Sequence, residues 1–250
     1  MNRSLGLISI LVLIFLAGTC LSFVSFDGLA SSAGHEGLSS KVTGSSQQAK
    51  PVESKDDGKT SLGARTVIIP VPVWVIGSYD KEGKPNVMTS SWVGVCSSKP
   101  ASVMTCLRGA TYTFGNIMER KAFTVNIPSE SFADEAAYVG RVSGRNVEKF
   151  TKTGLTPVKS ALVDAPYIRE FPLVIECRLK QTVELGSHTM FIGEIMDVKA
   201  DPSILNEEGA PDMEKLRPFV YSPGSARFYG IGKSLGDVSD LAKEKEKRER

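Results

Sequence analysis

Hydroxyl side chains crowd one apolar stretch of this sequence. The segment from Asn86 to Ser98 reads NVMTSSWVGVCSS, in which valines and Trp92 are interleaved with serine and threonine. A buried hydroxyl without a hydrogen-bond partner costs roughly 1–3 kcal/mol, so a strand that only filled a core would carry Ile, Leu and Phe instead. The pattern therefore predicts a polar ligand beside this strand.

Two further segments add cations and small donors. They read RGATYTF, from Arg108, and SGRNVEKF, from Ser143. A phosphate needs several charge-assisted hydrogen bonds, which Arg108, Arg145 and Lys149 can offer together with hydroxyls and loop amides. A flat conjugated ring needs donors along its rim and an aromatic wall, which the run TSSW can offer. Together the segments predict a site for a mononucleotide with a large planar head.

Other kinds of chemistry are not indicated. The sequence has no Ser/His/Asp or Cys/His constellation and no GxGxxG or GxxxxGK motif, so we expect no catalytic side chain and no metal site. Cys96, Cys106 and Cys177 lack the paired short spacing of a zinc knuckle or a CxxC redox motif. Buried free thiols are the favoured interpretation, with Cys96 facing Cys106 across a hairpin as the alternative.

The elements that must position these residues are mostly strands. We expect strands over 66–79, 86–98, 101–108, 122–128, 171–185 and 188–201, and helices over 111–121, 130–142 and 145–154. Pro70 and Pro72 place the first half of the first strand at an edge or outside the sheet. Consecutive strands joined by short turns, with helices inserted between them, predict a mainly β fold: an antiparallel barrel with peripheral helices.

Composition sets limits on the whole chain. Its 250 residues are 41% hydrophobic, which suits one sizeable domain with extensions. The formal net charge is only +2 and the basic residues form no stripe, which argues against a nucleic-acid partner.

The two ends of the chain differ from its middle. Residues 1–30 are predicted to be a signal peptide or an N-terminal membrane anchor, because Arg3 precedes a charge-free run from Leu5 to Phe26. Residues 31–65 predict a flexible linker, residues 66–235 the folded domain and residues 236–250 a charged tail. The positive-inside rule places the domain outside the cytoplasm, periplasmic or extracytoplasmic, either tethered to the membrane or released. A lipoprotein, lipidated at Cys20, is a further alternative.

Three runs together resemble a known family. They are TSSWVGVCSSKPASVMTCLRGATYTFGNI, AFTVNIPSESFADEAAYVGRVSGRNVEKFTKTGLTPV and LGSHTMFIGEIMDV. From about Val67 to Gly232 the chain resembles the flavoredoxin branch of the flavin-reductase-like FMN-binding split-barrel family. The resemblance implies a six-stranded antiparallel barrel, a homodimer and FMN held noncovalently near the dimer interface.

The resemblance also implies roles for particular residues. Around the flavin ring it would place Thr89, Ser90, Ser91 and Trp92. Near the phosphate it would place Arg108, Thr113, Ser143, Arg145 and Lys149. His188 follows the expected turn at Gly186 and either donates to the flavin or substrate, or is a turn histidine satisfied by backbone.

Flavin itself would supply the chemistry, while the protein binds and orients it. We therefore expect an FMN-dependent oxidoreductase, either a flavin reductase that uses NADH or NADPH or a flavoredoxin-like protein that takes electrons from a redox partner. The alternative is a noncatalytic extracytoplasmic protein that binds or carries flavin.

Overall fold

The computed structural model describes residues 58–248. The predicted leader, residues 1–30, and most of the predicted linker lie outside the described residues. Within residues 58–248, no helix has both the length and the apolar character needed to cross a membrane.

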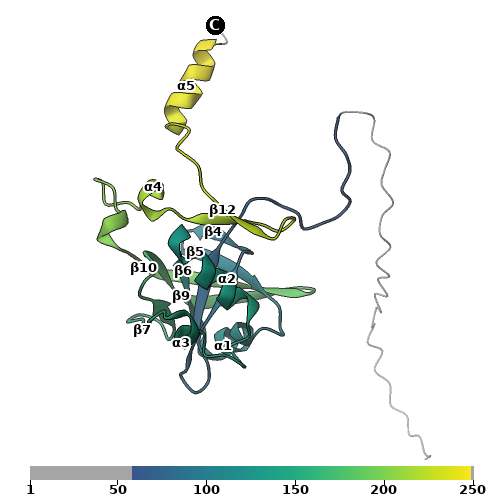
Figure 1. Cartoon of the computed structure of the whole chain (residues 1–250), viewed down its shortest axis with the longest axis vertical. Helices are drawn as coiled ribbons and strands as arrows, with labels where there is room; N and C mark the ends of the chain where they lie inside the picture. The colour runs from purple at the N-terminus through teal and green to yellow at the C-terminus, as the bar shows by residue number, and fades with distance from the viewer. Residues whose placement is uncertain (1–57, 249–250) are drawn as a thin grey trace, which may run out of the picture. The chain divides into compact units, whose positions relative to one another are not determined.

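A seven-stranded antiparallel sheet dominates the fold (Figure 1). Its strand order is β3-β2-β6-β9-β10-β5-β4. In chain order the strands are β2 (Trp74–Tyr79), β3 (Pro85–Ser90), β4 (Val93–Ser98), β5 (Ala101–Leu107), β6 (Ala122–Ile127), β9 (Leu173–Leu185) and β10 (His188–Ala200). The mainly β class with peripheral helices is confirmed, although the sheet has seven strands where six were expected.

The additional strand arises because the expected strand over 86–98 is two strands. β3 ends at Ser90 and β4 begins at Val93, so only Ser91 and Trp92 join them. These strands are the two opposite edges of the sheet. Ser90 and Val93 are three residues apart and so at most about 11 Å from each other, whereas seven flat strands about 4.8 Å apart would separate the edges by roughly 29 Å. The sheet must therefore curl until its edges nearly meet, which makes it a barrel.

A long hairpin forms the middle of the barrel. β9 and β10 pair along their length around a turn in which Gly186 has a φ of 73°, a left-handed conformation that glycine adopts without steric cost. On its other side β10 pairs with β5, where Thr189 lies opposite Leu107. This register brings the start of β10 beside the end of β5.

Two small sheets lie outside the seven-stranded sheet. One is β1 (Val71–Pro72), β11 (Phe219–Ser222) and β12 (Arg227–Gly230), and the other is β7 (Pro157–Lys159) paired with β8 (Pro166–Ile168). β1 pairs only with β11, which confirms that the segment around Pro70 and Pro72 leaves the main sheet. Of these five strands, only β1 was predicted from the sequence.

Helices cover the barrel at its flanks. They are α1 (Tyr112–Arg120), the short η1 (Glu130–Phe132), α2 (Ala133–Arg141) and α3 (Lys149–Thr153). In Figure 1 α1, α2 and α3 gather around the strands, where α1 contacts β2 and both α2 and α3 contact β3. After β10 follow η2 (Pro202–Ile204), α4 (Met213–Leu216) and α5 (Val238–Arg248), and α5 buries no residue.

Two apolar clusters hold these layers together. The barrel interior is filled around Phe123 and Phe191, and Ile117 of α1 closes it. The second cluster joins Val87 of β3 to Val139 of α2. α1 and α2 are therefore fixed to β3 and its neighbours by burial, and Thr111, the N-cap of α1, lies beside the β3–β4 junction.

Cysteine burial differs from the expectation. All three described cysteines are free, but only Cys177 is buried, whereas Cys106 is partly buried and Cys96 is exposed. Cys96 lies on the edge strand β4 at an irregularity in its pairing with β5, between Val95 and Ser97. The prediction of buried thiols is thus wrong for Cys96, which lies in the part of β4 whose side chains are mostly exposed.

Candidate functional site

A shallow cavity of about 310 Å³ lies where β3 passes into β4. Its volume is at the lower end of the range of about 300–1,000 Å³ found for small-molecule sites. Ten residues line it: Met88, Thr89, Ser90, Ser91, Trp92, Cys106, Leu107, Arg108, Thr111 and His188. None of these ten is a carboxylate, so the cavity suits a neutral or anionic ligand.

Six of the predicted site residues therefore meet in one place. Thr89 to Trp92 come from the β3–β4 junction, Arg108 follows β5, and His188 starts β10. The strand register explains this meeting, because Leu107 opposite Thr189 brings Arg108 beside His188. From the sequence, these six residues were grouped only by their chemical type. In the structure, the curl of the sheet brings them together.

Trp92, His188 and Arg108 form one contact group at the cavity. The rings of Trp92 and His188 stack with centroids 4.3 Å apart and planes 29° apart. Arg108 Nε donates to His188 Nε2 at 3.4 Å, and Ser187 Oγ lies 2.9 Å from His188 Nδ1. An arginine Nε always carries a proton, so His188 Nε2 is the acceptor in this contact. The side-chain partners of His188 are thus an arginine and a serine rather than backbone.

The hydroxyls of β3 are partly satisfied within the protein. Ser90 Oγ and Thr105 Oγ1 lie 3.1 Å apart, and Thr89 Oγ1 donates to the carbonyl oxygen of Ala136 at 2.5 Å. Ser91 has no side-chain hydrogen bond among residues 58–248 and is half-buried. Burial within the protein therefore accounts for two of the three hydroxyls, and Ser91 keeps a donor available for a ligand.

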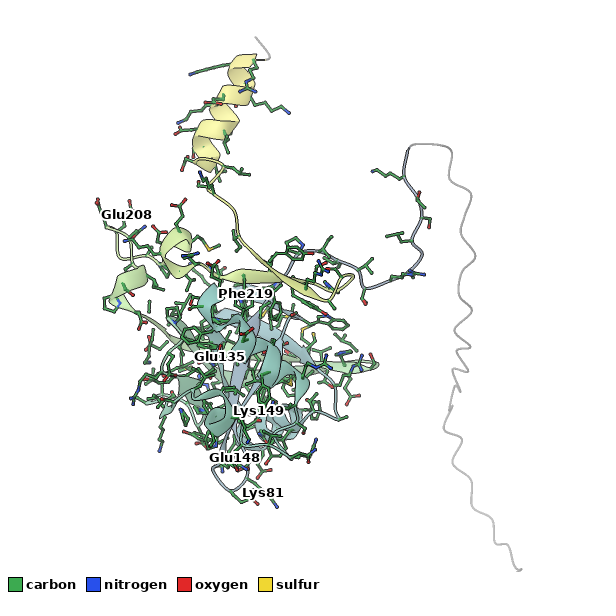
Figure 2. The ribbon with its side chains drawn as sticks, viewed as in Figure 1. Lys81, Glu135, Glu148, Lys149, Glu208 and Phe219 are labelled. Atoms are coloured by element: carbon green, nitrogen blue, oxygen red, sulfur yellow. The ribbon has the colours of Figure 1, made fainter. Side chains whose placement is uncertain are left out.

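Two predicted phosphate residues lie elsewhere. Thr113 is 1% exposed and its Oγ1 accepts a hydrogen bond from Asn86 Nδ2 at 2.9 Å. Lys149 is 4% exposed, and its ammonium donates to the carbonyl oxygens of Val87 at 2.7 Å and Val139 at 2.8 Å. Figure 2 labels Lys149 at α3, within the folded body. The structure does not bring either residue to the cavity, because each side chain is already committed to a buried contact.

Burial changes the titration of two groups named above. It lowers the pKa of Lys149 to about 8, because the charged ammonium loses its hydration. It raises the pKa of Cys106, so this cavity thiol stays protonated. Cys106 is therefore a wall of the cavity rather than a nucleophile.

Ser143 and Arg145 lie on the other flank of the N-terminus of α1. Arg145 lines a second hollow of about 220 Å³ together with Asp80 and Tyr112. Its Nη1 donates to the carbonyl oxygen of Ala110 at 2.8 Å, and its guanidinium lies 5.3 Å from the centroid of the Tyr112 ring. Ser143 is exposed, and its Oγ accepts from the Arg145 amide at 3.3 Å.

The N-terminus of α1 lies between the two arginines in the chain's fold. Thr111 caps the helix, and its Oγ1 accepts from the Phe114 amide at 3.3 Å. The loop before the cap carries Arg108 at one end, while Ala110 in the same loop binds Arg145. A helix N-terminus favours negative charge, so the loop between Arg108 and Thr111 can accommodate an anionic group. Thr111 was not among the predicted residues, although the pattern of a threonine before an amphipathic run signals an N-cap.

A hydrogen-bond network at Asp80 was not predicted from the sequence. The Tyr112 hydroxyl donates to Asp80 Oδ2 at 2.7 Å, and the amides of Glu82 and Lys84 donate to Asp80 Oδ1. Burial alone would raise the pKa of Asp80, but these hydrogen bonds hold it below its ordinary value. The same contact with Asp80 raises the pKa of Tyr112 to about 12. The network fixes the first turn of α1 to the β2–β3 turn.

Comparisons with known proteins agree with this architecture. Residues 65–229 match the family model described as "Flavin reductase like domain". The flavoredoxin of Desulfovibrio vulgaris (Miyazaki F) is 46% identical with a TM-score of 0.70, and the match covers 74% of this chain and 99% of that one. A flavoredoxin from Methanosarcina acetivorans is 28% identical with a TM-score of 0.68, covering 74% of this chain and 98% of that one.

A curated relative carries a more specific name. The "Ferric-chelate reductase (NAD(P)H)" of Archaeoglobus fulgidus is 27% identical over 125 residues. The match covers 50% of this chain and 73% of that protein.

Proposed function

Because the chain belongs to the flavin reductase-like domain family, we propose that it is an FMN-binding flavoprotein oxidoreductase whose flavin site is the cavity at the β3–β4 junction. The observation that carries this proposal is the convergence of Trp92, Ser91 and Arg108 on one cavity without a carboxylate. Such a donor set fits a planar ring whose rim is rich in acceptors and whose tail is anionic.

The residues of the site divide by the part of FMN they would hold. Trp92 offers an aromatic face to the ring, and the Ser91 hydroxyl offers a donor to its rim. Arg108, the capped N-terminus of α1 and Arg145 offer positive charge to the phosphate. Thr113 and Lys149 are removed from this group, since the first is bonded to Asn86 and the second to two carbonyl oxygens.

Bound FMN would accept and release electrons, singly or as hydride. The protein's task is then to hold the ring and to favour its anionic reduced form. The absence of a carboxylate among the ten lining residues leaves no negative charge beside the ring, and the Ser91 hydroxyl offers it a hydrogen-bond donor, so both favour added negative charge. No lining side chain needs to act as an acid or base.

We propose NADH or NADPH as the electron donor, with a redox protein as the second candidate. The name of the ferric-chelate reductase relative supports the first, and the flavoredoxin relatives support the second. Anaerobic addition of NADH or NADPH to the purified FMN-loaded protein should bleach the flavin absorbance near 450 nm. Bleaching by dithionite but by neither nucleotide would exclude NADH and NADPH as donors. Reduction of the bound flavin by an added reduced redox protein would then support electron transfer between proteins, and its absence would favour a carrier.

The oligomeric state and the cellular location of the protein are proposals that rest on the sequence. We propose a homodimer, which the resemblance implies, and an exported barrel, which the charge-free run after Arg3 supports. Sedimentation of the purified domain tests the first. The second is tested by protease accessibility, described below.

A further inference from the structure

β3 buries an amide that makes no contact with the flavin cavity. Asn86 is 3% exposed, and its Nδ2 donates to Thr113 Oγ1 at 2.9 Å and to Ser78 Oγ at 3.5 Å. Its Oδ1 is also buried but has no hydrogen-bond partner among residues 58–248. A buried amide oxygen without a partner lowers stability, so its presence calls for a reason.

Gly144 is the residue whose backbone lies against Asn86 Oδ1. A Cβ at position 144 would lie 2.1 Å from Asn86 Oδ1 and 2.8 Å from Tyr112 Cδ1, closer than real Cβ atoms come to other heavy atoms. Glycine is therefore required here for space. The backbone at 144 rests directly on the Asn86 amide, and its neighbours in the chain are Ser143 and Arg145.

The same segment has a second anchor on β3. Lys149, five residues after Gly144, donates to the carbonyl oxygen of Val87, the neighbour of Asn86. Segment 143–149 is thus held to two adjacent residues of β3, by packing at one end and by a buried ammonium at the other. Between these anchors the chain has little freedom to shift.

Arg145 lies within segment 143–149, so the position of this segment sets the position of its guanidinium. Its guanidinium is extended over Tyr112 toward the loop before α1, where Nη1 bonds to Ala110. Tyr112 and Thr113 open α1 and contact the Asn86–Gly144 pair from the other side. One buried amide therefore touches both elements that would hold an anion, namely the first turn of α1 and the segment that carries Arg145.

We propose that Asn86 is a positioning residue for the phosphate end of the flavin site, and that it acts through Gly144 on Arg145. This inference rests on the proposed function, since it assigns a role within the same site. Asn86 does not touch the flavin; it sets the separation between the N-terminus of α1 and the guanidinium of Arg145.

The test compares FMN with riboflavin, which has the same ring without the phosphate. Affinities for both are measured for the wild type and for Asn86→Ala, Gly144→Ala and Arg145→Ala, and for the double variants that combine Arg145→Ala with each of the first two. We expect Asn86→Ala and Gly144→Ala each to weaken FMN binding about tenfold and riboflavin binding less than about threefold. In the Arg145→Ala background each should add less than a twofold loss, because the group through which they act is gone.

Gly224→Ala is the matched control. Gly224 lies between β11 and β12, outside both hollows, and a Cβ there would meet nothing within 4 Å, so both affinities should stay unchanged. If Asn86→Ala does not fold, Gly144→Ala alone decides the comparison, and riboflavin binding reports whether each variant is folded.

The outcomes separate the inference from the function. Equal losses for FMN and riboflavin, full additivity with Arg145→Ala, or an Arg145→Ala variant with unchanged FMN affinity would each overturn the role of Asn86 while the proposed function stands. A wild type that binds neither ligand would instead overturn the proposed function.

Discussion

Arg108 and His188 are in contact although 80 residues separate them, with Arg108 Nε 3.4 Å from His188 Nε2. The contact exists because β5 and β10 are neighbours and Leu107 lies opposite Thr189. It holds the guanidinium at the rim of the cavity instead of leaving a long, mobile side chain in solvent. An arginine fixed in this way loses less conformational entropy when it binds an anion.

Arg108→Ala should weaken FMN binding roughly ten- to a hundredfold, the value of a charge-assisted hydrogen bond of about 1.5–3 kcal/mol. Riboflavin binding should change much less, as isothermal titration of both ligands would show. Arg169→Ala removes an exposed arginine outside the cavity and serves as the control. If both ligands lose affinity equally, Arg108 does not contact the phosphate.

Trp92→Ala should affect both ligands alike. An aromatic stacking contact is worth about 0.5–1.5 kcal/mol beyond burial, so FMN and riboflavin should each lose roughly three- to tenfold in affinity. Val95→Ala, which shortens an exposed apolar side chain on β4, is the control. A Trp92 variant that discriminates between the two ligands would show that this side chain lies near the phosphate rather than the ring.

Lys149 predicts a dependence of stability on pH. Its pKa is about 8 in the folded protein, below the ordinary value of about 10.4, so between these values the unfolded chain holds more protons. The free energy of unfolding should therefore rise with pH across this window, by at most about 1.4 kcal/mol per pH unit. The neutral amine still has two N–H groups for its two carbonyl partners, so the fold is not lost.

Denaturation of Lys149→Met between pH 7.5 and about 10.5 would isolate this contribution. The difference in unfolding free energy between wild type and Lys149→Met should grow in favour of the wild type as pH rises. Lys152→Met, which removes an exposed lysine from the same helix, should show no such trend. A flat difference for Lys149→Met would mean that the ammonium keeps its ordinary pKa.

Tyr112→Phe should destabilise the fold by about 1.5–3 kcal/mol at pH 7, because Asp80 loses a charge-assisted hydrogen bond. The pKa of Asp80 is lowered in the folded protein, so this stabilisation is present above the pKa of the unfolded chain and is lost as pH falls through the folded value. The difference from wild type, measured by urea denaturation, should therefore shrink below about pH 4. Tyr167→Phe is the control, and a difference that shrinks at no pH below about 4 would argue against a charge-assisted hydrogen bond to Asp80.

Protease accessibility tests the proposed export. Protease added to intact spheroplasts should digest the barrel while a cytoplasmic marker protein survives. A variant without residues 1–30 should remain protected until the membrane is broken. Protection of the full-length chain would place the barrel in the cytoplasm.

Some of this site was readable from residue types. Trp92 and its neighbouring hydroxyls stand out because a strand that only fills a core has no use for them, and the strands and helices follow from their periodicity. Lys149 was predicted to lie near the phosphate because a lysine beside Ser143 and Arg145 is a typical anion ligand, and this role stays a prediction. Only the packing of α3 on β3 shows that its ammonium is buried against two carbonyl oxygens.

The break between β3 and β4 could not be read in the same way. Ser91 and Trp92 continue the alternation of the strand, so no local signal marks the point where the chain leaves one sheet edge for the other. That event depends on the curl of all seven strands. Contacts such as Asn86 with Gly144 are equally non-local, since they require three elements to be placed first.

The two-residue passage from β3 to β4 leaves no slack in the chain. Ser91 and Trp92 can be replaced by other residue types. The number of residues between β3 and β4 cannot change unless the barrel changes with it. One inserted residue would turn the side chains that follow it in β4 to the opposite face, so Val93, which is buried, would be exposed. The link formed by Ser91 and Trp92 can therefore vary in residue type but not in length. Related sequences should align at these two positions without gaps, even where their residues differ.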